Sequence, residues 1–375
     1  MNTQRYLRGA LLLIVFLPLL GMVCCSESQT RVEVKREPGD RAQWFSIDTV
    51  DDHLVVAVKR PWDTLVQRFV VCKKGEDVPE RLKYMKVLRV PVERLVCTSS
   101  TLVSFANQLG VVNSIVGISD IQFTFNKSIR DGQQRGTVVE IGQGSEYYFE
   151  EIVRVKPDIA VLSLFQDQQT QRFTDLGIET VPFADYLEAT PLARLDWIRF
   201  AGVLFDRLDL ANRYYDSISS NYSNLREKTK TISTRPTVLD GLPIEGTWWV
   251  SGGESYMAAM YRDAGADYIW KDLKGSASIA MPFEKVVADA STASFWRLVI
   301  AVPNKYTLSE LMKTDERFST FKATGNRGVI YCNSFLMPLF EEGVVVPDRV
   351  LSDLIFVFHP ELLPGYQPLF YKTLL

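Results

Sequence analysis

The sequence predicts an α/β protein with two doubly wound lobes joined by one long helix, preceded by an antiparallel β extension. Strand and helix signals alternate from Val90 onward, which is typical of parallel sheets covered by helices. One long helical pattern interrupts the alternation, which restarts after Pro236. The length agrees, because 375 residues at about 100–200 per domain suffice for two lobes and a tail.

The composition excludes several classes of protein and of site. Hydrophobic residues make up 46% and charged residues 23%, which is typical of a globular chain and not of a disordered, collagen-like or coiled-coil one. A net charge of -3 argues against general nucleic-acid binding. With only His53 and His359, no histidine-rich metal site and no cofactor are expected. We interpret Cys72, Cys97 and Cys332 as small buried hydrophobes, with a single disulfide as the alternative.

The first residues have the pattern of an export signal. Arg5 and Arg8 precede the apolar run 10–23. A helix that spans a bilayer needs about 20 apolar residues, and this run is shorter. Cys24 and Cys25 follow directly, as in the lipobox of bacterial lipoproteins. We therefore predict a signal peptide over 1–24 and lipidation at Cys24 or Cys25, with plain secretion as the alternative.

Residues 25–92 form the predicted β-rich extension. Three β-prone runs, at 44–47, 54–58 and 67–71, are separated by turn residues and indicate a small antiparallel meander. The sequence assigns no chemistry to this segment.

The first α/β lobe is predicted over 93–206. Apolar runs with flanking turn residues indicate its strands and helices. The expected strands are 94–97, 114–118, 158–162 and 180–182, and the expected helices are 99–109, 150–155 and 168–176.

The segment 207–233 is predicted to be the connecting helix. Apolar residues recur every three or four positions from Leu208 to Leu225, and no proline interrupts the path from Leu192 to Thr234. At 1.5 Å per residue such a helix is about 35 Å long, enough to reach from one lobe to the other. A second lobe follows over 234–375, with strands expected at 237–239, 248–250, 295–302 and 328–332 and helices at 255–264, 283–290 and 348–358.

Several motifs together carry a family resemblance. Residues 149–153 and 283–287 share the pattern Phe-Glu-x-(Ile/Val)-Val in equivalent places of the two halves. With the motifs at 92–99, 115–120, 252–256, 264–268 and 347–361, the chain from about 91 to 372 resembles the substrate-binding proteins of bacterial ABC importers for iron-siderophore, haem and vitamin B12. This resemblance implies two lobes, a helical connection and a ligand held between the lobes.

The resemblance also implies where a permease binds. Glu150 and Glu284 match the family glutamates, one per lobe, that dock onto arginines of the membrane permease. Two carboxylates, one on each lobe, can each form a bidentate pair with one arginine of the permease. The alternative is that each glutamate only complements the dipole of its helix.

Aromatic and hydroxyl side chains near the expected cleft are the candidate ligand-binding residues. Trp248 and Trp249 are neighbours on one strand and therefore point to opposite faces, so we expect one in the core and the other at the cleft. Weaker candidates are Tyr147, Ser99, Ser100, Phe123 and Tyr256, and Arg130, Arg135 and Arg262 are alternatives for an anionic ligand.

The resemblance implies transport, and catalysis is not expected because the common nucleotide-binding and hydrolase motifs are missing. We expect a lipid-anchored periplasmic protein that binds a ferric siderophore, haem or cobalamin and delivers it to an ABC permease in the inner membrane, with no nucleic-acid partner. A surface lipoprotein that acts as an interaction module, and a cofactor-dependent α/β enzyme, are the alternatives.

Overall fold

The computed structural model describes residues 40–60, 66–163 and 169–375. The predicted signal peptide and the cysteines proposed for lipidation, Cys24 and Cys25, lie outside these residues. Residues 34–375 form one compact unit, and the account below concerns its described part. None of the helices described there is both long and apolar enough to cross a membrane.

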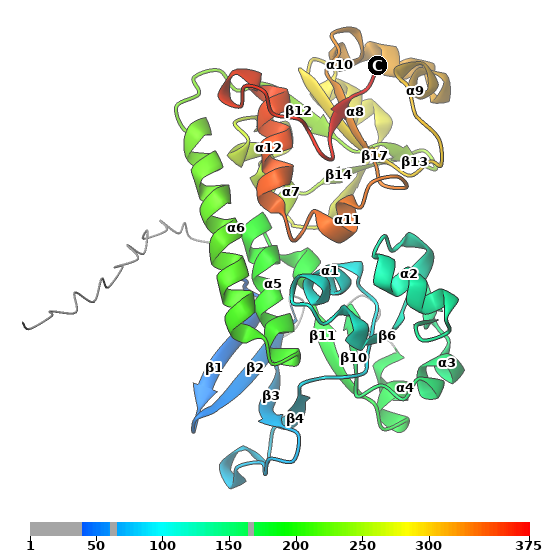
Figure 1. Ribbon diagram of the computed structural model, residues 1–375. Coiled ribbons are helices and arrows are strands. Elements are labelled where there is room, and N and C mark those ends of the chain that lie inside the picture. Colours follow the sequence, from blue (N-terminus) through cyan, green and yellow to red (C-terminus); the bar gives the residue numbers. More distant parts are fainter. Residues whose placement is uncertain (1–39, 61–65, 164–168) are drawn as a thin grey trace, which may run out of the picture. The chain divides into compact units, whose positions relative to one another are not determined.

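The extension is a four-stranded sheet with the order β1-β2-β3-β4 (Figure 1). The strands β1 (Phe45–Val50), β2 (His53–Lys59) and β3 (Val66–Lys73) pair antiparallel, which confirms the predicted meander. The fourth strand, β4 (Lys86–Val90), was not predicted and pairs parallel to β3. Its direction follows because the intervening residues, including a 3-10 turn at Glu80–Leu82, carry the chain back along β3.

A buried carboxylate fastens the start of the extension to the first lobe. Glu188 has no exposed surface and accepts hydrogen bonds from the backbone N–H groups of Gln43 and Trp44 and from Trp197 Nε1. Phe45 packs against Trp197 with ring centroids 4.8 Å apart. The extension therefore shares a core with the first lobe.

The first lobe contains a five-stranded parallel sheet with helices on both faces. Its order is β11-β10-β5-β6-β7, from β5 (Leu95–Cys97), β6 (Ile115–Ile118), β7 (Val139–Glu140), β10 (Ile159–Ser163) and β11 (Glu179–Phe183). Side chains alternate across the sheet: Leu95 and Cys97 belong to the main core, which includes α1 (Ser100–Gln108) and α5 (Pro191–Leu204). Val96 belongs to a separate cluster with residues of α3 (Phe149–Arg154) and α4 (Thr170–Asp175). The remaining helix, α2 (Lys127–Gln134), was not predicted.

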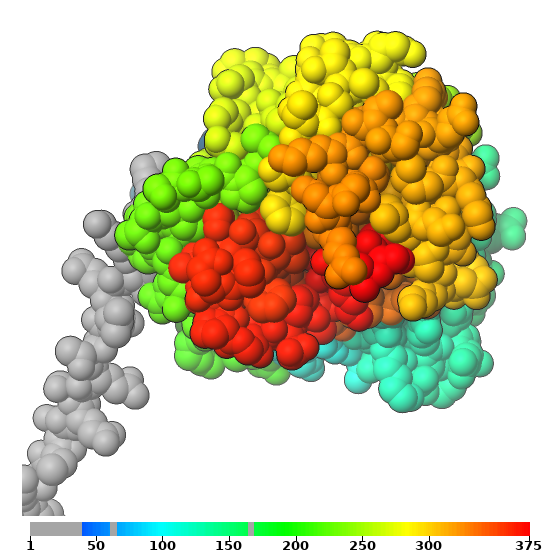
Figure 2. Space-filling model, turned by 90° about the horizontal axis from the view of Figure 1, so that it is seen from above, coloured from blue at the N-terminus to red at the C-terminus, as the bar shows by residue number. Residues whose placement is uncertain are grey.

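The long helix predicted within 207–233 is α6, which runs from Leu208 to Thr229. Its 22 residues span about 33 Å. It begins beside α5 and then packs along α12 (Pro347–Phe358) of the second lobe (Figure 1). Figure 2 shows the same pairing from above, with the green segment of α6 against the red segment of α12. One continuous helix therefore contacts both lobes.

The second lobe has a mixed five-stranded sheet with the order β15-β12-β17-β18-β19. Its strands are β12 (Thr237–Asp240), β15 (Asp267–Tyr268), β17 (Phe295–Ile300), β18 (Val329–Asn333) and the antiparallel edge strand β19 (Lys372–Thr373). Around it lie α7 (Tyr256–Asp263), α8 (Phe283–Ala290), α9 (Leu308–Thr314), α10 (Lys322–Gly325), α11 (Leu339–Glu342) and α12.

Two smaller sheets complete the described strands. The sheet β13-β14-β16 is formed by β13 (Pro243–Ile244), β14 (Thr247–Ser251) and β16 (Ser278–Met281), and a two-stranded sheet is formed by β8 (Gly142–Gln143) and β9 (Glu146–Tyr147). The α/β class with two helix-covered sheets is as predicted. The three cysteines Cys72, Cys97 and Cys332 are buried and free, so the alternative of a disulfide is wrong.

Candidate functional site

A pocket of about 350 Å³ opens at the carboxyl end of β12 in the second lobe. In α/β folds this edge is where ligands bind, because the loops that follow parallel strands converge there. Its wall is partly apolar, with Trp249, Tyr256, Met257 and Phe340, and partly polar, with the serines of the 276–278 loop. Gly241 permits this construction, since a Cβ atom there would lie 2.0 Å from the carbonyl oxygen of Trp249.

A smaller pocket of about 40 Å³ adjoins the first and reaches the other lobe. It shares Tyr256, Met257, Arg297 and Phe340 with the larger pocket, and α5 closes it with Pro191 and Arg194. The two pockets therefore form a continuous site, called the cleft site below, between the start of α5 and the second lobe.

Arg194 is the charged group that the first lobe brings to the cleft site. Its guanidinium lies 4.3 Å above the ring of Tyr256, and one Nη atom is 2.8 Å from a carboxylate oxygen of Asp185. Burial works against its charge, but Asp185 and Tyr256 outweigh this effect and raise the pKa of Arg194. Its buried Nε has no hydrogen-bond partner among the described residues. Arg194 is thus a cation held in place by Asp185 and Tyr256.

Arg297 is the corresponding cation of the second lobe. It projects from β17, and its Nε and Nη2 donate to the hydroxyl of Tyr371, at 3.0 and 2.5 Å. Nearby, the buried Asp240 accepts hydrogen bonds from Ser251 and from the hydroxyls of Tyr261 and Tyr268. Burial opposes the charge of Arg297, but the tyrosines and Asp240 raise its pKa well above the ordinary value. Each lobe therefore supplies an arginine to the cleft site: Arg194 is paired with Asp185, and Arg297 lies near Asp240, which also lines the larger pocket.

The two lobes also touch through a buried glutamate on α11. Glu341 is only 3% exposed and accepts hydrogen bonds from Thr124 Oγ1 and from the backbone N–H of Phe125, both at 2.7 Å. Burial outweighs these bonds and raises the pKa of Glu341. Its neighbour Phe340 lines both pockets, so this contact holds one wall of the cleft site against the first lobe.

The two tryptophans predicted as ligand contacts lie in different surroundings. Trp249 is 43% exposed and lines the larger pocket. Trp248 has no exposed surface: it packs against Trp296, with ring centroids 5.4 Å apart, and donates its indole N–H to the carbonyl of Asp240. Trp248 is therefore the core member of the pair, and its place among the candidate ligand-binding residues is corrected, because an enclosed side chain has no surface to offer a ligand.

The other predicted ligand residues are divided between the cleft site and the rest of the first lobe. Tyr256 lines both pockets, whereas Ser99 and Ser100, at the start of α1, and Phe123, which is 62% exposed, line neither. Tyr147 packs edge-on against Phe149 and Phe173 and lines a separate surface depression beside Glu150. Only part of the predicted set therefore comes together.

The three arginines weighed for an anionic ligand also line neither pocket of the cleft site. Arg130 donates to the carbonyl of Thr124, Arg135 is exposed at the end of α2, and Arg262 lines a pocket beside the end of α6. The arginines that do line it, Arg194 and Arg297, were missed. An arginine inside the apolar strand 295–300 was the available signal, since such a strand rarely carries a charge without a local reason.

The two glutamates of the internal repeat lie at corresponding surface sites, one on each lobe. These sites, Phe149 and Glu150 with Arg172 and Phe283 and Glu284 with Arg317, are called the corners below. Glu150 and Glu284 are both exposed in the first turns of α3 and α8. The preceding Phe149 and Phe283 are 7% and 8% exposed, and an arginine lies over each ring: Arg172 at 4.1 Å and Arg317 at 3.8 Å. In both lobes a buried ring and its arginine hold the helix start that presents the glutamate.

Two helix-covered α/β sheets, a single long connecting helix and a pocket between the lobes define a two-lobe solute-binding protein. A family model described as periplasmic binding protein matches residues 95–335. The chain therefore belongs to the periplasmic binding protein family. This membership places it among binding proteins and not enzymes, as the sequence predicted, and the extension lies outside the matched residues.

Individual relatives agree with this assignment. An uncharacterized lipoprotein of Methanocaldococcus jannaschii is 27% identical over 82% of this chain and 76% of its own length. The crystal structure of IsdE from S. aureus complexed with heme is similar with a TM-score of 0.56 and 19% identity, over 71% of this chain and 98% of that one. An ABC-type Fe3+-hydroxamate transport system from Saccharomonospora viridis gives a TM-score of 0.57 and 17% identity, over 72% and 94%. At such identities the likeness to solved structures establishes the shared fold.

Proposed function

We propose that this protein is an exported, lipid-anchored receptor that binds an anionic metal chelate in the cleft site and delivers it to an ABC permease. The observation that carries the proposal is the composition of the cleft site. Arg194 and Arg297 come from different lobes, and Trp249 and Tyr256 form an aromatic wall beside them. Such a site offers stacking surface and a guanidinium group from each lobe to one ligand.

Ferric siderophores, haem and corrinoids are the ligand classes to be tested. All three combine a large unsaturated or chelating framework with polar groups at the periphery. The similar structures named above include a protein complexed with heme and an Fe3+-hydroxamate transport system, which supports this choice. A chelate with carboxylate or other anionic groups matches the two arginines best, because guanidinium groups bind planar anions bidentately.

Delivery to a permease is proposed from the two corners of the internal repeat. Glu150 and Glu284 stand exposed, one on each lobe, on helices held by the same Phe–Arg pairing. Two carboxylates at fixed positions suit docking onto two arginines of a partner. The lipoprotein names of two relatives, 27% and 23% identical, support the proposed anchor at Cys24 or Cys25 and a location in the periplasm.

The deciding experiment is a titration of the full-length chain, purified in detergent, with ferric siderophores, haem and cobalamin. Trp249 is half-exposed in the larger pocket, so we expect quenching of tryptophan fluorescence that saturates at one ligand per chain. In the matched control Trp249→Phe, the signal should shrink while binding measured by calorimetry remains.

The outcomes distinguish the candidate functions. Saturable binding of one ligand class that weakens at least tenfold in Arg194→Gln or Arg297→Gln would support the receptor. A flat response to every ligand tested would overturn it and favour a surface lipoprotein acting as an interaction module.

A further inference from the structure

The β extension contains a cluster of three potential metal ligands outside the cleft site. His53, Cys72 and Glu76 each place one donor atom so that the three atoms lie within 4.8 Å of one another. None of them lines the cleft site or lies in the region matched by the family model. Neither solute capture nor permease docking accounts for this cluster.

The pairing of β2 with β3 brings these residues together. The register Val55↔Val70, continued by two residues away from the connection between β2 and β3, places Cys72 opposite His53. After β3 the chain turns at Gly75, whose φ of 84° is in the left-handed region that favours glycine. The turn returns Glu76 toward β3, where one of its carboxylate oxygens, Oε2, accepts a hydrogen bond of 2.8 Å from the backbone N–H of Lys73. The sheet thereby fixes all three side chains locally.

The hydrogen bonds of His53 determine which ring nitrogen faces the cluster. Nδ1 lies 2.8 Å from the carbonyl oxygen of Asp51. A carbonyl can only accept, so Nδ1 carries the hydrogen, and Nε2 of the neutral ring has a lone pair. Metal-binding histidines are commonly oriented by the same kind of bond from their other nitrogen.

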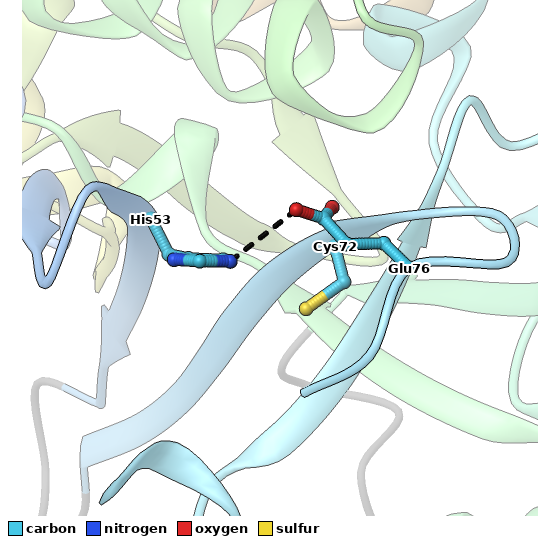
Figure 3. A group of neighbouring side chains, drawn as sticks. All are labelled: His53, Cys72 and Glu76. Atoms are coloured by element: carbon cyan, nitrogen blue, oxygen red, sulfur yellow. Dashed lines mark ion pairs between the residues drawn. The ribbon is translucent and has the colours of Figure 1, made fainter. Parts of the chain in front are cut away.

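Nε2 of His53 faces a carboxylate oxygen. Figure 3 shows the imidazole directed toward Glu76, with the sulfur of Cys72 nearby. The distance from Nε2 to Oε1 of Glu76 is 3.4 Å. Two lone pairs at this distance repel each other unless a cation joins them. A proton can join these two atoms as well, so the argument for a metal ion depends on the third donor, the sulfur of Cys72, within 4.8 Å of both.

We propose that His53, Cys72 and Glu76 bind a divalent ion of the zinc class. Two atoms bound at about 2.1 Å to a tetrahedral zinc ion lie about 3.4 Å apart, which the histidine and glutamate atoms already satisfy. One nitrogen, one sulfur and one oxygen ligand suit Zn²⁺ better than Mg²⁺ or Ca²⁺, which prefer oxygen alone.

The burial of the three groups fits an ion that enters from solvent. The side chains of His53 and Glu76 are 21% and 44% exposed, whereas Cys72 is 1% exposed. The sulfur therefore lies on the buried side of the cluster and the other two groups on the solvent side, where water or a further ligand could complete the coordination. The bound ion would tie β2, β3 and the turn after β3 to one another.

The test uses Co²⁺ as a spectroscopic substitute for Zn²⁺ on the full-length chain in detergent, after treatment with a chelator. We expect one equivalent of Co²⁺ to give the visible bands of a tetrahedral site and a near-ultraviolet sulfur-to-cobalt charge-transfer band. One equivalent of Zn²⁺ should abolish both. Any background from Cys24 and Cys25 is the same in every variant.

Variants assign the signal to the cluster. Cys72→Ser should remove the charge-transfer band, and His53→Gln and Glu76→Gln should each weaken Co²⁺ binding at least tenfold. Cys97→Ser and Cys332→Ser, which alter buried free cysteines elsewhere, should leave the spectrum unchanged. Glu76→Gln keeps an acceptor for Lys73 and is exposed, so it tests the site even if another variant fails to fold.

The proposal would be overturned if the charge-transfer band persisted in Cys72→Ser, or if Glu76→Gln bound Co²⁺ as tightly as the unaltered chain. An unaltered chain that gives no tetrahedral cobalt spectrum would overturn it as well. These results are separate from ligand binding in the cleft site, which is followed by tryptophan fluorescence.

Discussion

The two lobes have nearly the same arrangement of residues at their exposed corners, but they contribute very different surfaces to the cleft site. In each lobe a Phe-Glu pair opens a helix, and an arginine covers the phenylalanine ring. The first lobe contributes Pro191 and Arg194 to the cleft site, and the second lobe contributes the aromatic wall, Arg297 and α11.

The comparison separates two tasks. A symmetric pair of corners suits recognition by a partner with two equivalent halves, whereas an asymmetric cleft suits selection of a ligand mainly by one lobe. Even the corners differ in their ion pairs. Glu284 lies 4.0 Å from Arg317, which is also paired with Asp315, whereas the neighbour of Glu150, Glu151, is paired with Arg154.

The largest expected effect comes from reversing both corners. The double variant Glu150→Arg/Glu284→Arg should abolish ligand import, because it replaces attraction to permease arginines by repulsion at both docking points. Ligand affinity should change less than about twofold, since both residues are exposed and outside the cleft site. Uptake of labelled ligand by cells and calorimetry on the purified chain measure the two quantities.

A matched reversal elsewhere separates docking from general charge effects. Glu93→Arg/Glu361→Arg changes the net charge equally at two other exposed glutamates, which lie outside the cleft site and both corners, and should leave import intact. Equal loss of import in both double variants would refute the symmetric-corner interpretation.

The asymmetry of the cleft site predicts the next largest effect. Trp249→Ala should weaken ligand binding at least tenfold, because a large ring in the pocket wall loses its stacking and dispersion contacts. Phe123→Ala removes an even more exposed ring from the first lobe and should change affinity less than about twofold. Isothermal titration of both variants gives the ratio, and similar losses would mean that the lobes share ligand contact evenly.

A smaller effect is expected at the contact between the lobes. Glu341→Ala removes the acceptor of Thr124 and of the Phe125 N–H, which should weaken ligand binding about three- to tenfold by loosening the wall that carries Phe340. Glu342→Ala, at the exposed neighbouring position, is the control and should bind normally. An unchanged affinity in Glu341→Ala would show that this contact does not shape the cleft site.

The smallest effects test the likeness of the corners directly. Arg172→Ala and Arg317→Ala should each lower the free energy of unfolding by a small amount, because each removes a cation over an aromatic face. Urea denaturation measures both, with the exposed Arg213→Ala as the control. A clear difference between the two would mean that the corners are alike in sequence but not in energetics.

The main elements of the fold could be read from local patterns. The uninterrupted three-to-four spacing around Tyr215 and Tyr222 predicted α6, and the alternating apolar runs predicted the central strands of both sheets. Short elements escaped because their patterns are too brief: α11 has four residues and β4 has five, and neither was predicted. The parallel pairing of β4 depends on a returning loop, which spacing does not encode.

The candidate site was harder to predict because distant segments build it. Arg194, Arg297 and Glu341 come from three different elements, and only the folded arrangement brings them toward one cleft. Adjacent side chains on a strand alternate, so the sequence indicated that one tryptophan of the 248–249 pair would be enclosed but not which one. The His53, Cys72 and Glu76 cluster was missed for a similar reason, because it depends on strand register and not on a short motif.

The continuity of α6 has a consequence for competition at the membrane. A helix of 22 residues packed against both lobes resists bending, so the receptor with and without its cargo should keep the two corner glutamates at nearly the same separation. In the proposed role, vacant molecules would then occupy the transporter almost as readily as filled ones. Uptake would depend on the fraction of receptors that are filled, and overproducing the receptor at scarce cargo would slow import.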